Sequence, residues 1–410
     1  MNTELIISLI IGLSAFFAYI NQRFIKMPFV IGLFFLSTII SIGILFTKFF
    51  SHEYFVKLKF ILDNIDISKY VLEYMLGYLL FAGAFHTDWK DIRDNLKPII
   101  IFSVFGVLVS TFLIGEILYE TLKLFNIQLS LIYCMLFGAL ISPTDPIAVL
   151  GILKKANVSK KIEGTIVGES LFNDGVGVVV FLVILDLINN GNTEFNFLRF
   201  GTFFIQESFG GIGFGLLSGY ILHKALSTID HYETEVLLTL AFVMIGYKLS
   251  NSLHISGALA MVVMGLYIGN YKQNKSMSDT TMEYVNKFWE LIDVILNSVL
   301  FVIISFVLVV VDFKQEYIII AIISIFIVLL SRALVIYLSK LLFHKIINYD
   351  NQETKLIIWG GLRGGLSLAL VLSLPNTEQQ HILLILTYFC VVFSILIQGL
   401  TIGQIAKITK

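Results

Sequence analysis

Three carboxylic acids lie inside long apolar stretches, where a charged side chain is costly to solvate. Asp145 stands in the segment ISPTDPIAVL, between Pro143 and Pro146. Glu169 and Asp174 stand in the segment GESLFNDGVGVVVF. A carboxyl group held away from water is stable when it pairs with a cation or keeps a proton. Such an acid can therefore hold either a proton or a small cation, which is the chemistry of ion exchange.

The spacing of the second segment places its acids beside other polar groups. Glu169 and Asn173 are four residues apart, as are Ser170 and Asp174, so each pair lies on one helical face. One turn of helix thus offers an acid with an amide and, rotated from it, a hydroxyl with a carboxylate. Glycines at 164, 168, 175 and 177 allow another helix to approach closely.

Two arginines also lie in apolar stretches. Arg332 is in SRALVIY, and Arg363 stands among four glycines in WGGLRGGLSLAL. An arginine at mid-membrane costs at least ~2.5 kcal/mol on insertion scales, so it normally has a partner. If each arginine takes one acid, one carboxylate remains to exchange ions. A purely structural pairing stays open for Glu169 and for Asp174, and we expect Arg332 to orient Glu169.

The composition indicates where these side chains lie. The chain has 410 residues, of which 57% are hydrophobic and 14% charged, whereas a soluble domain has about a quarter charged residues. So much apolar surface cannot be buried in one globular core, which predicts an all-α polytopic protein of the cell membrane. A net charge of −1 gives no reason to expect a nucleic-acid partner. Cys134 and Cys390 fall in apolar runs and are predicted to be small buried residues.

Thirteen apolar windows approach the roughly 20 residues that a helix needs to cross hydrocarbon. They fall at about 5–20, 28–47, 70–87, 97–119, 129–153, 164–188, 202–222, 235–250, 255–270, 286–311, 316–343, 356–374 and 381–404. The first window has no cleavage site and is read as a span. Lysine and arginine are more than twice as frequent in one set of alternate loops. Because positive charge stays cytoplasmic, we expect the N-terminus outside and the C-terminus inside.

Thirteen spans suggest one span linking two six-helix repeats. The repeats would cover about 5–188 and 235–404, and the linking span about 202–222. The window at 129–153, broken by prolines, then corresponds to the window at 356–374, broken by glycines. Two interrupted segments at matching positions point to a transporter binding site, because non-helical backbone at membrane depth must face protein or a water-filled cavity.

The motifs, taken in order, resemble the cation:proton antiporter-1 family. They are SPTDPIAV, GESLFNDGVGVVVF, ISGALAMVVMGLYIGN, FWELIDVILNSVLF, SRALVIY and GGLRGGLSLAL, and the resemblance runs from about residue 5 to 405. Bacterial NhaP-type sodium/proton antiporters and eukaryotic sodium/proton exchangers belong to this family. The resemblance implies two inverted repeats, two unwound helices that cross near the midplane, and a homodimer. It implies no enzyme activity and no cofactor, and, unlike members with long cytoplasmic tails, we expect no regulatory domain after the last span.

The resemblance also implies roles for the residues of an ion site. Asp174 would be the exchange carboxylate and Asn173 the amide that precedes it. Asp145 and Thr144 would belong to the unwound segment, and Ser170 would be a further ligand of the transported Na⁺. These five residues are the predicted site for the transported ion.

Three more residues would support that site. Glu169 would pair with Arg332 without binding the cation, and Arg363 would offset half-helix dipoles. One departure stands out, because many family members carry an acid where this chain has Ala82. Glu73 is nine residues earlier, about 180° around a helix, so it cannot simply substitute.

These observations predict a secondary antiporter that exchanges cytoplasmic Na⁺ or Li⁺ for external H⁺ and serves pH homeostasis. Asn173 before Asp174, in place of a second aspartate, indicates electroneutral 1:1 exchange by the family's pattern. K⁺/H⁺ exchange stays open, whereas a channel is disfavoured because paired broken helices suit alternating access. An intramembrane aspartyl protease would also need two aspartates, but no GxGD segment surrounds either one. Glu290 and Asp293 could line a funnel toward the site.

Overall fold

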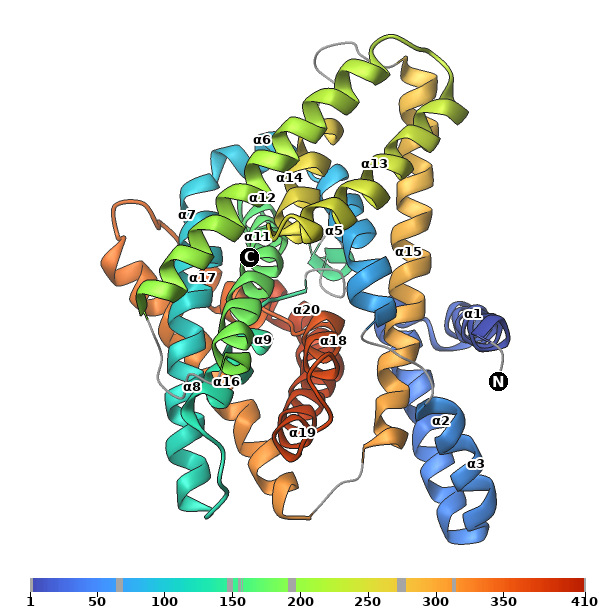
Figure 1. Cartoon of the computed structure of the whole chain (residues 1–410), viewed down its shortest axis with the longest axis vertical. Helices are drawn as coiled ribbons and strands as arrows, with labels where there is room; N and C mark the ends of the chain where they lie inside the picture. The colour runs from blue at the N-terminus through green and yellow to red at the C-terminus, as the bar shows by residue number, and fades with distance from the viewer. Residues whose placement is uncertain are drawn as a thin grey trace.

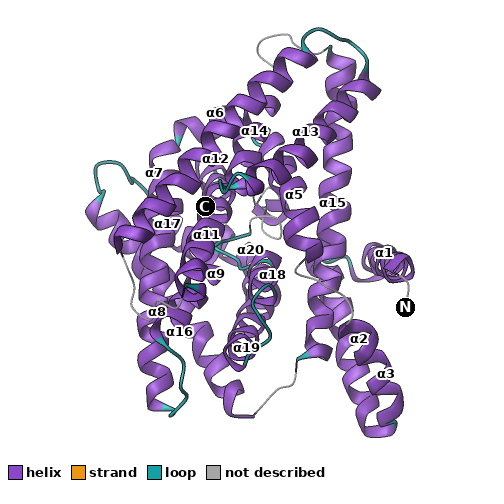
Figure 2. Ribbon diagram, in the orientation of Figure 1, coloured by secondary structure: helices purple, strands orange, loops and turns teal. Residues whose placement is uncertain are grey.

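The computed structural model describes residues 3–63, 69–145, 150–153, 156, 158–190, 197–270, 278–311 and 315–408. The regular structure of these residues is helical throughout, as Figure 2 shows, and they form no strand. The prediction of an all-α protein is confirmed.

The first part of the chain forms helices in its apolar windows and short helices between some of them. They are α1 (Thr3–Ile20), η1 (Asn21–Ile25), α2 (Phe29–Phe50), α3 (His52–Asp63), η2 (Tyr70–Met75), α5 (Leu76–Phe85), α6 (Trp89–Asp94), α7 (Leu96–Ile100), η3 (Ile101–Phe105), α8 (Gly106–Leu124), α9 (Leu131–Ile141) and α11 (Lys160–Asn189). The segments marked η are single π-helical turns, which continue into the neighbouring α-helices.

The second part of the chain follows the same plan. Its helices are α12 (Phe197–Leu226), α13 (Tyr232–Ser252), α14 (Gly257–Gly269), α15 (Asp279–Val310), α16 (Gln315–Leu342), α17 (Asn351–Trp359), α18 (Gly365–Leu372), α19 (Glu378–Phe393), η5 (Ser394–Gln398) and α20 (Gly399–Ile408). Seven helical stretches among the described residues are long and apolar enough to cross a membrane. The count of thirteen spans and the division into two inverted repeats stay predictions.

Two kinds of helix were not anticipated from the apolar windows. The long helices α11 and α15 begin at Lys160 and Asp279, one to two turns before the windows that predicted them. Helix α3 lies outside every window and packs on α2 and α15. Backbone hydrogen bonding continues past the hydrocarbon, so a helix does not end where its apolar sequence ends. An exposed pair between Lys57 and Glu53 (2.6 Å) adds to the polar character of α3.

The helices pack as two groups around two clusters of buried apolar side chains. In Figure 1, α8 and α15 run along opposite sides of the view, with α9, α11, α18 and α19 between them. Helices α5, α12, α13 and α14 pack on one another, whereas α9 packs on α8 and α19 packs on α16. Helix α11 touches both groups. Cys134 and Cys390 are free and buried, as predicted.

The two predicted interruptions are present, and they meet. Helix α9 ends at Ile141 and residues 142–145 are not helical, while Pro146 lies outside the described residues. Helix α17 ends at Trp359, and α18 begins only at Gly365. The Asp145 N–H donates a hydrogen bond to the Leu362 carbonyl oxygen at 2.7 Å. The unwound segments therefore cross in direct backbone contact.

Arg363, in the unwound segment between α17 and α18, stabilises this crossing through hydrogen bonds. Its Nη1 donates to the Ser142 carbonyl oxygen and, at 3.0 Å, to the Pro143 carbonyl oxygen. Its own backbone N–H donates to the Ser394 hydroxyl at 2.7 Å. One arginine, 3% exposed, thus supplies donors to carbonyl groups that lost their helical partners at the proline break.

Gly364 is required by the close approach of the two segments. A Cβ atom at this position would overlap the Asp145 side chain. Gly364→Ala should therefore destabilise the protein by about 1–3 kcal/mol, as other insertions into packed sites do. Gly213→Ala is the matched control, because a Cβ at Gly213 would meet nothing within 4 Å. We expect the thermal unfolding midpoint in detergent to fall for Gly364→Ala and to hold or rise for Gly213→Ala. Equal midpoints for both variants would contradict the proposed close contact.

Candidate ion-binding site

Helix α11 holds the first unwound segment through Thr144. The Asn173 Oδ1 accepts from the Thr144 backbone N–H at 3.1 Å, and the Asn173 Nδ2 donates to the Thr144 hydroxyl at 2.8 Å. The Ser170 hydroxyl lies 2.9 Å from the Thr144 hydroxyl. All three side chains are buried. Three residues of the predicted site therefore form one hydrogen-bonded unit that fixes the break in α9.

Close approach of α9 and α11 makes this unit possible. A Cβ at Gly177 would overlap the Pro143 ring, so this glycine lets the broken end of α9 lie against α11. The glycine-rich sequence of α11 predicted such an approach, and the structure shows it at this position.

The buried pair implied by the resemblance is also present. Both terminal nitrogens of Arg332 donate to the carboxylate oxygens of Glu169, with the Nη2–Oε2 pair at 2.9 Å. The Arg332 Nη2 also donates to the Ile357 carbonyl oxygen at 3.2 Å, near the end of α17. Glu169 is 1% exposed and Arg332 is 6% exposed. Both carboxylate oxygens of Glu169 are therefore bound to Arg332, and Glu169 does not line the cavity that Asp174 enters.

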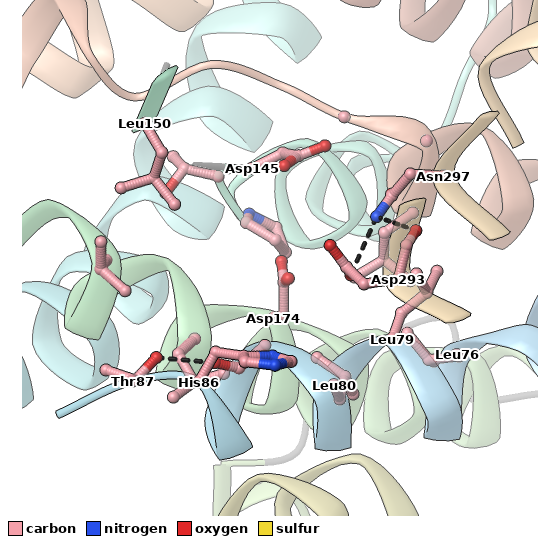
Figure 3. Close-up of a pocket in the computed structure, with 18 of the residues that line it drawn as sticks. Leu76, Leu79, Leu80, His86, Thr87, Asp145, Leu150, Asp174, Asp293 and Asn297 are labelled. Atoms are coloured by element: carbon pink, nitrogen blue, oxygen red, sulfur yellow. Dashed lines mark hydrogen bonds between the residues drawn. The ribbon is translucent and has the colours of Figure 1, made fainter. Parts of the chain in front are cut away.

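Asp174 points the other way, into a cavity of about 780 Å³. Asp145 lines the same cavity, and its charge acts on Asp174. Figure 3 shows the two acids approaching the same space from different elements. Among the described residues, Asp174 accepts no hydrogen bond and neither arginine contacts it. Asp174 therefore stands in the cavity without an arginine partner among the described residues.

The wall of the cavity is strongly acidic. Besides Asp145 and Asp174 it includes Asp88, Asp91, Glu163, Glu290 and Asp293. Lys160 is the one lysine or arginine among its described lining residues. A cleft lined by one sign of charge raises the local concentration of the opposite ion. Glu290 and Asp293, which the sequence suggested as parts of a funnel, both line this wall.

The ligands available for a bound cation are few. Among the described residues, no group of three or more His, Cys, Asp or Glu side chains could hold a metal ion. A transported Na⁺ at Asp145 and Asp174 would therefore complete its shell with water, hydroxyl or carbonyl oxygens, the ligands that hard cations prefer. The hydroxyls of Thr144 and Ser170 are adjacent, although in this arrangement they bond to each other.

The position that carries an acid in many family members holds no polar group here. Ala82 is fully buried in α5. Glu73 lies in η2 and lines a different cavity, of about 440 Å³, together with Asp186 and Glu207. Glu73 therefore does not replace the missing acid, as its helical position indicated. Leu76 lines both cavities.

Several polar residues of the cavity were not predicted from the sequence, and one of them, Asn297, contacts a predicted acid. Asn297, on α15, lines the wall and its Nδ2 donates to the Asp293 carboxylate at 3.0 Å. The i, i+4 spacing of the two residues within an apolar helix was a signal for this pair. The spacing did not reveal which way that face of α15 points.

Nearly the whole chain matches a known protein family. The profile of the family described as sodium/hydrogen exchanger, transmembrane, matches residues 12–408. The chain belongs to this family. Membership confirms the resemblance found in the sequence, and it makes the chain a multi-pass membrane transporter rather than an enzyme. The aspartyl protease alternative is thereby set aside.

Individual relatives agree with this assignment. The chain is 42% identical over 407 residues to the Na⁺/H⁺ antiporter NhaP of Pseudomonas aeruginosa, covering 98% of this chain and 96% of the relative. It is 32% identical over 340 residues to the Na⁺/H⁺ antiporter NhaH of Halobacillus dabanensis, covering 82% of each chain. The structure of the sodium proton antiporter MjNhaP1 of Methanocaldococcus jannaschii shares the fold, with a TM-score of 0.75 at 20% identity over 97% of this chain and 96% of that one.

The Glu169–Arg332 pair gives a stability prediction. Arg332→Gln should cost about 3–5 kcal/mol, because it leaves a carboxylate buried without its partner. Adding Glu169→Gln should recover part of the loss. We expect the thermal midpoint in detergent to be lower for the single variant than for the double variant.

The exposed pair of Lys287 with Glu283 on α15 (2.6 Å) is the matched control. The corresponding Lys287→Gln variant should change stability by less than about 1 kcal/mol. The two buried residues are uncoupled if the double variant is as unstable as the sum of the single ones.

Proposed function

We propose that the chain exchanges Na⁺ for H⁺ across the membrane, with Asp174 as the exchange carboxylate. One observation carries the proposal: Asp174 lines the cavity while both buried arginines are occupied elsewhere. Arg332 is bound to Glu169, and Arg363 donates to two carbonyl groups. A carboxylate in this setting can be neutralised by a proton or by Na⁺, and the two compete because each satisfies the same charge.

The neighbours of Asp174 define how the exchange would run. Asp145 adds a second negative charge, which favours an occupied site over an empty one. Asn173 and Ser170 hold Thr144 and so keep the unwound segment beside the acid. The cavity is lined by Lys160, at the start of α11, and by Asp88, just before α6. We assign these helix ends to the cytoplasm because the connecting segments are rich in lysine and arginine. The structure would then represent the form that accepts cytoplasmic Na⁺.

Finer features of the function remain part of this proposal. We propose electroneutral 1:1 exchange, transport of Li⁺ as well as Na⁺, and a role in pH homeostasis. A bundle that includes α9, α11, α16, α17 and α18 would move against the rest of a homodimeric protein built from two inverted repeats. The N-terminus would face outward and the C-terminus the cytoplasm. K⁺ is the alternative cation, since two carboxylates set ion choice only loosely.

The role of Asp174 can be tested in everted membrane vesicles loaded with a ΔpH-sensitive dye. Asp174→Asn leaves no group at this position that can release a proton for a cation, so Na⁺ should cause no dequenching. Glu120→Gln is the control, because Glu120 is exposed and bonded to Lys123 at the end of α8. Expression of both variants should match that of the wild type. Substantial exchange by Asp174→Asn would move the chemistry to another acid, and separate additions of Na⁺, K⁺ and Li⁺ decide the cation.

Stoichiometry gives a second test, which depends on Asn173 being uncharged. One titrating acid moves one Na⁺ against one H⁺, so no net charge crosses the membrane. The potential is worth about 2.3 kcal/mol per charge per 100 mV, yet such a cycle cannot use it. In proteoliposomes clamped with K⁺ and valinomycin, the null point should lie where the Na⁺ and H⁺ ratios are equal at every potential.

That clamp requires K⁺ to be shown beforehand not to be transported. A null point that shifts with voltage would mean that a second proton is carried. Asp145 would then be the residue to examine, since Glu169 is held by Arg332.

A further inference from the structure

Helix α15 presents polar groups to the cavity from an element other than the unwound segments and α11. Asp293 and Asn297 project from it toward the space that Asp145 and Asp174 also line (Figure 3). Helix α15 packs on α2, α5 and α13, whereas α11, which carries Asp174, packs on α7 and α9. The cavity thus has side-chain oxygen atoms on two different helices, α11 and α15.

The hydrogen bonding of Asn297 orients its amide. Its Nδ2 donates to the Asp293 backbone carbonyl at 2.9 Å and to the Asp293 Oδ1 at 3.0 Å. This leaves the Asn297 carbonyl oxygen and the Asp293 Oδ2 as acceptors. The Asn297 side chain is 2% exposed and lines the cavity, and its carbonyl oxygen accepts no hydrogen bond from the described part of the chain. Because Asn297 lines the cavity, this amide oxygen can accept a hydrogen bond from water there or coordinate a cation.

We propose that Asp293 and Asn297 form a second site for the transported cation, on the wall of the cavity that does not carry Asp174. The ligands would be one carboxylate oxygen, one amide oxygen and water, a set that suits Na⁺. This inference rests on the proposed function. On this proposal Asp293, on α15, supplies the third carboxylate of the cavity in place of the acid that is absent at Ala82, on α5.

The charges around the second site indicate that it acts before Asp174. Asp145 and Glu290 both act on Asp293 with negative charge, and His86 opposes them when protonated. Asp293 is partly exposed, so a cation held there keeps water and binds weakly. A weak site beside the exchange acid speeds the delivery of Na⁺ to that acid at low Na⁺, whereas delivery no longer limits the rate at saturating Na⁺. The second site therefore affects the apparent KM for Na⁺ and leaves the maximal rate unchanged.

The test is the Na⁺ dependence of exchange in everted vesicles. Asp293→Asn should raise the apparent KM about fivefold, a change typical of losing a partly hydrated ion contact, with an unchanged maximal rate. Asn297→Leu removes the amide oxygen at similar volume and should also raise KM. Asp293→Glu, which keeps the charge, should remain near wild type. Glu283→Gln, on the same helix but outside the cavity, is the control for α15.

The experiment must distinguish direct coordination of Na⁺ by Asp293 from a general attraction of Na⁺ to a negatively charged wall. Glu290 lines the same wall, so an attraction that depends on charge alone would make Glu290→Gln equal to Asp293→Asn. Such an attraction would also disappear in about 0.5 M choline chloride, where screening acts over a few ångströms. A specific site requires Asp293→Asn to have the larger effect and to keep it at high salt. The proposal is overturned if the two variants behave alike, or if Asp293→Asn has the wild-type KM.

A binding measurement keeps this inference distinct from the proposed function. Purified Asp174→Asn protein, which should not exchange, should still bind ²²Na⁺ weakly, and Asp174→Asn with Asp293→Asn should lose that binding. If wild-type vesicles do not respond to Na⁺ but this binding is found, the proposed function fails and the second site remains. If vesicles respond and the binding is the same in both variants, the second site is wrong. Size-exclusion profiles matching wild type are required of each variant.

Discussion

The carbonyl groups exposed by two broken helices are the constraint on which this structure depends. A helix that ends inside hydrocarbon leaves acceptors that no water can reach. Here two buried arginines supply the missing donors: Arg363 beyond the end of α9 and Arg332 near the end of α17. Each arginine is carried by an element other than the one it completes. The broken helix ends are therefore stabilised by donors from neighbouring elements, which is why the interruptions are stable inside the membrane.

The positions of the two buried arginines also determine which buried carboxylate has no arginine partner. Arg332 brings a positive charge into the membrane, and Glu169 neutralises it with a two-point contact. The Arg363 Nη1 donates to two carbonyl groups, which are neutral and so do not cancel the charge of the guanidinium. No arginine reaches Asp174 among the described residues. The same placement of the two arginines thus supplies hydrogen-bond donors to the broken helices and leaves Asp174 without an arginine partner.

Local sequence was enough to locate the breaks but not to show what completes them. Pro143 removes a backbone donor and glycines surround Arg363, so interruption at both places follows from backbone chemistry. The donation from Arg363 to the carbonyl groups of Ser142 and Pro143 joins residues more than two hundred positions apart, which no local pattern encodes. Asn297 was missed for a related reason, because the rotation of α15 relative to the cavity is set by packing against distant helices.

Leu76 lines the large cavity on one side and the smaller cavity on the other. The insulating layer between the two is therefore a single side chain thick at this point, far thinner than a hydrocarbon core of about 30 Å. If the two cavities open to opposite faces of the membrane and fill with water, the electric field of the membrane is concentrated in that layer. The field also acts on each half of the transport cycle separately, even when a complete cycle moves no charge.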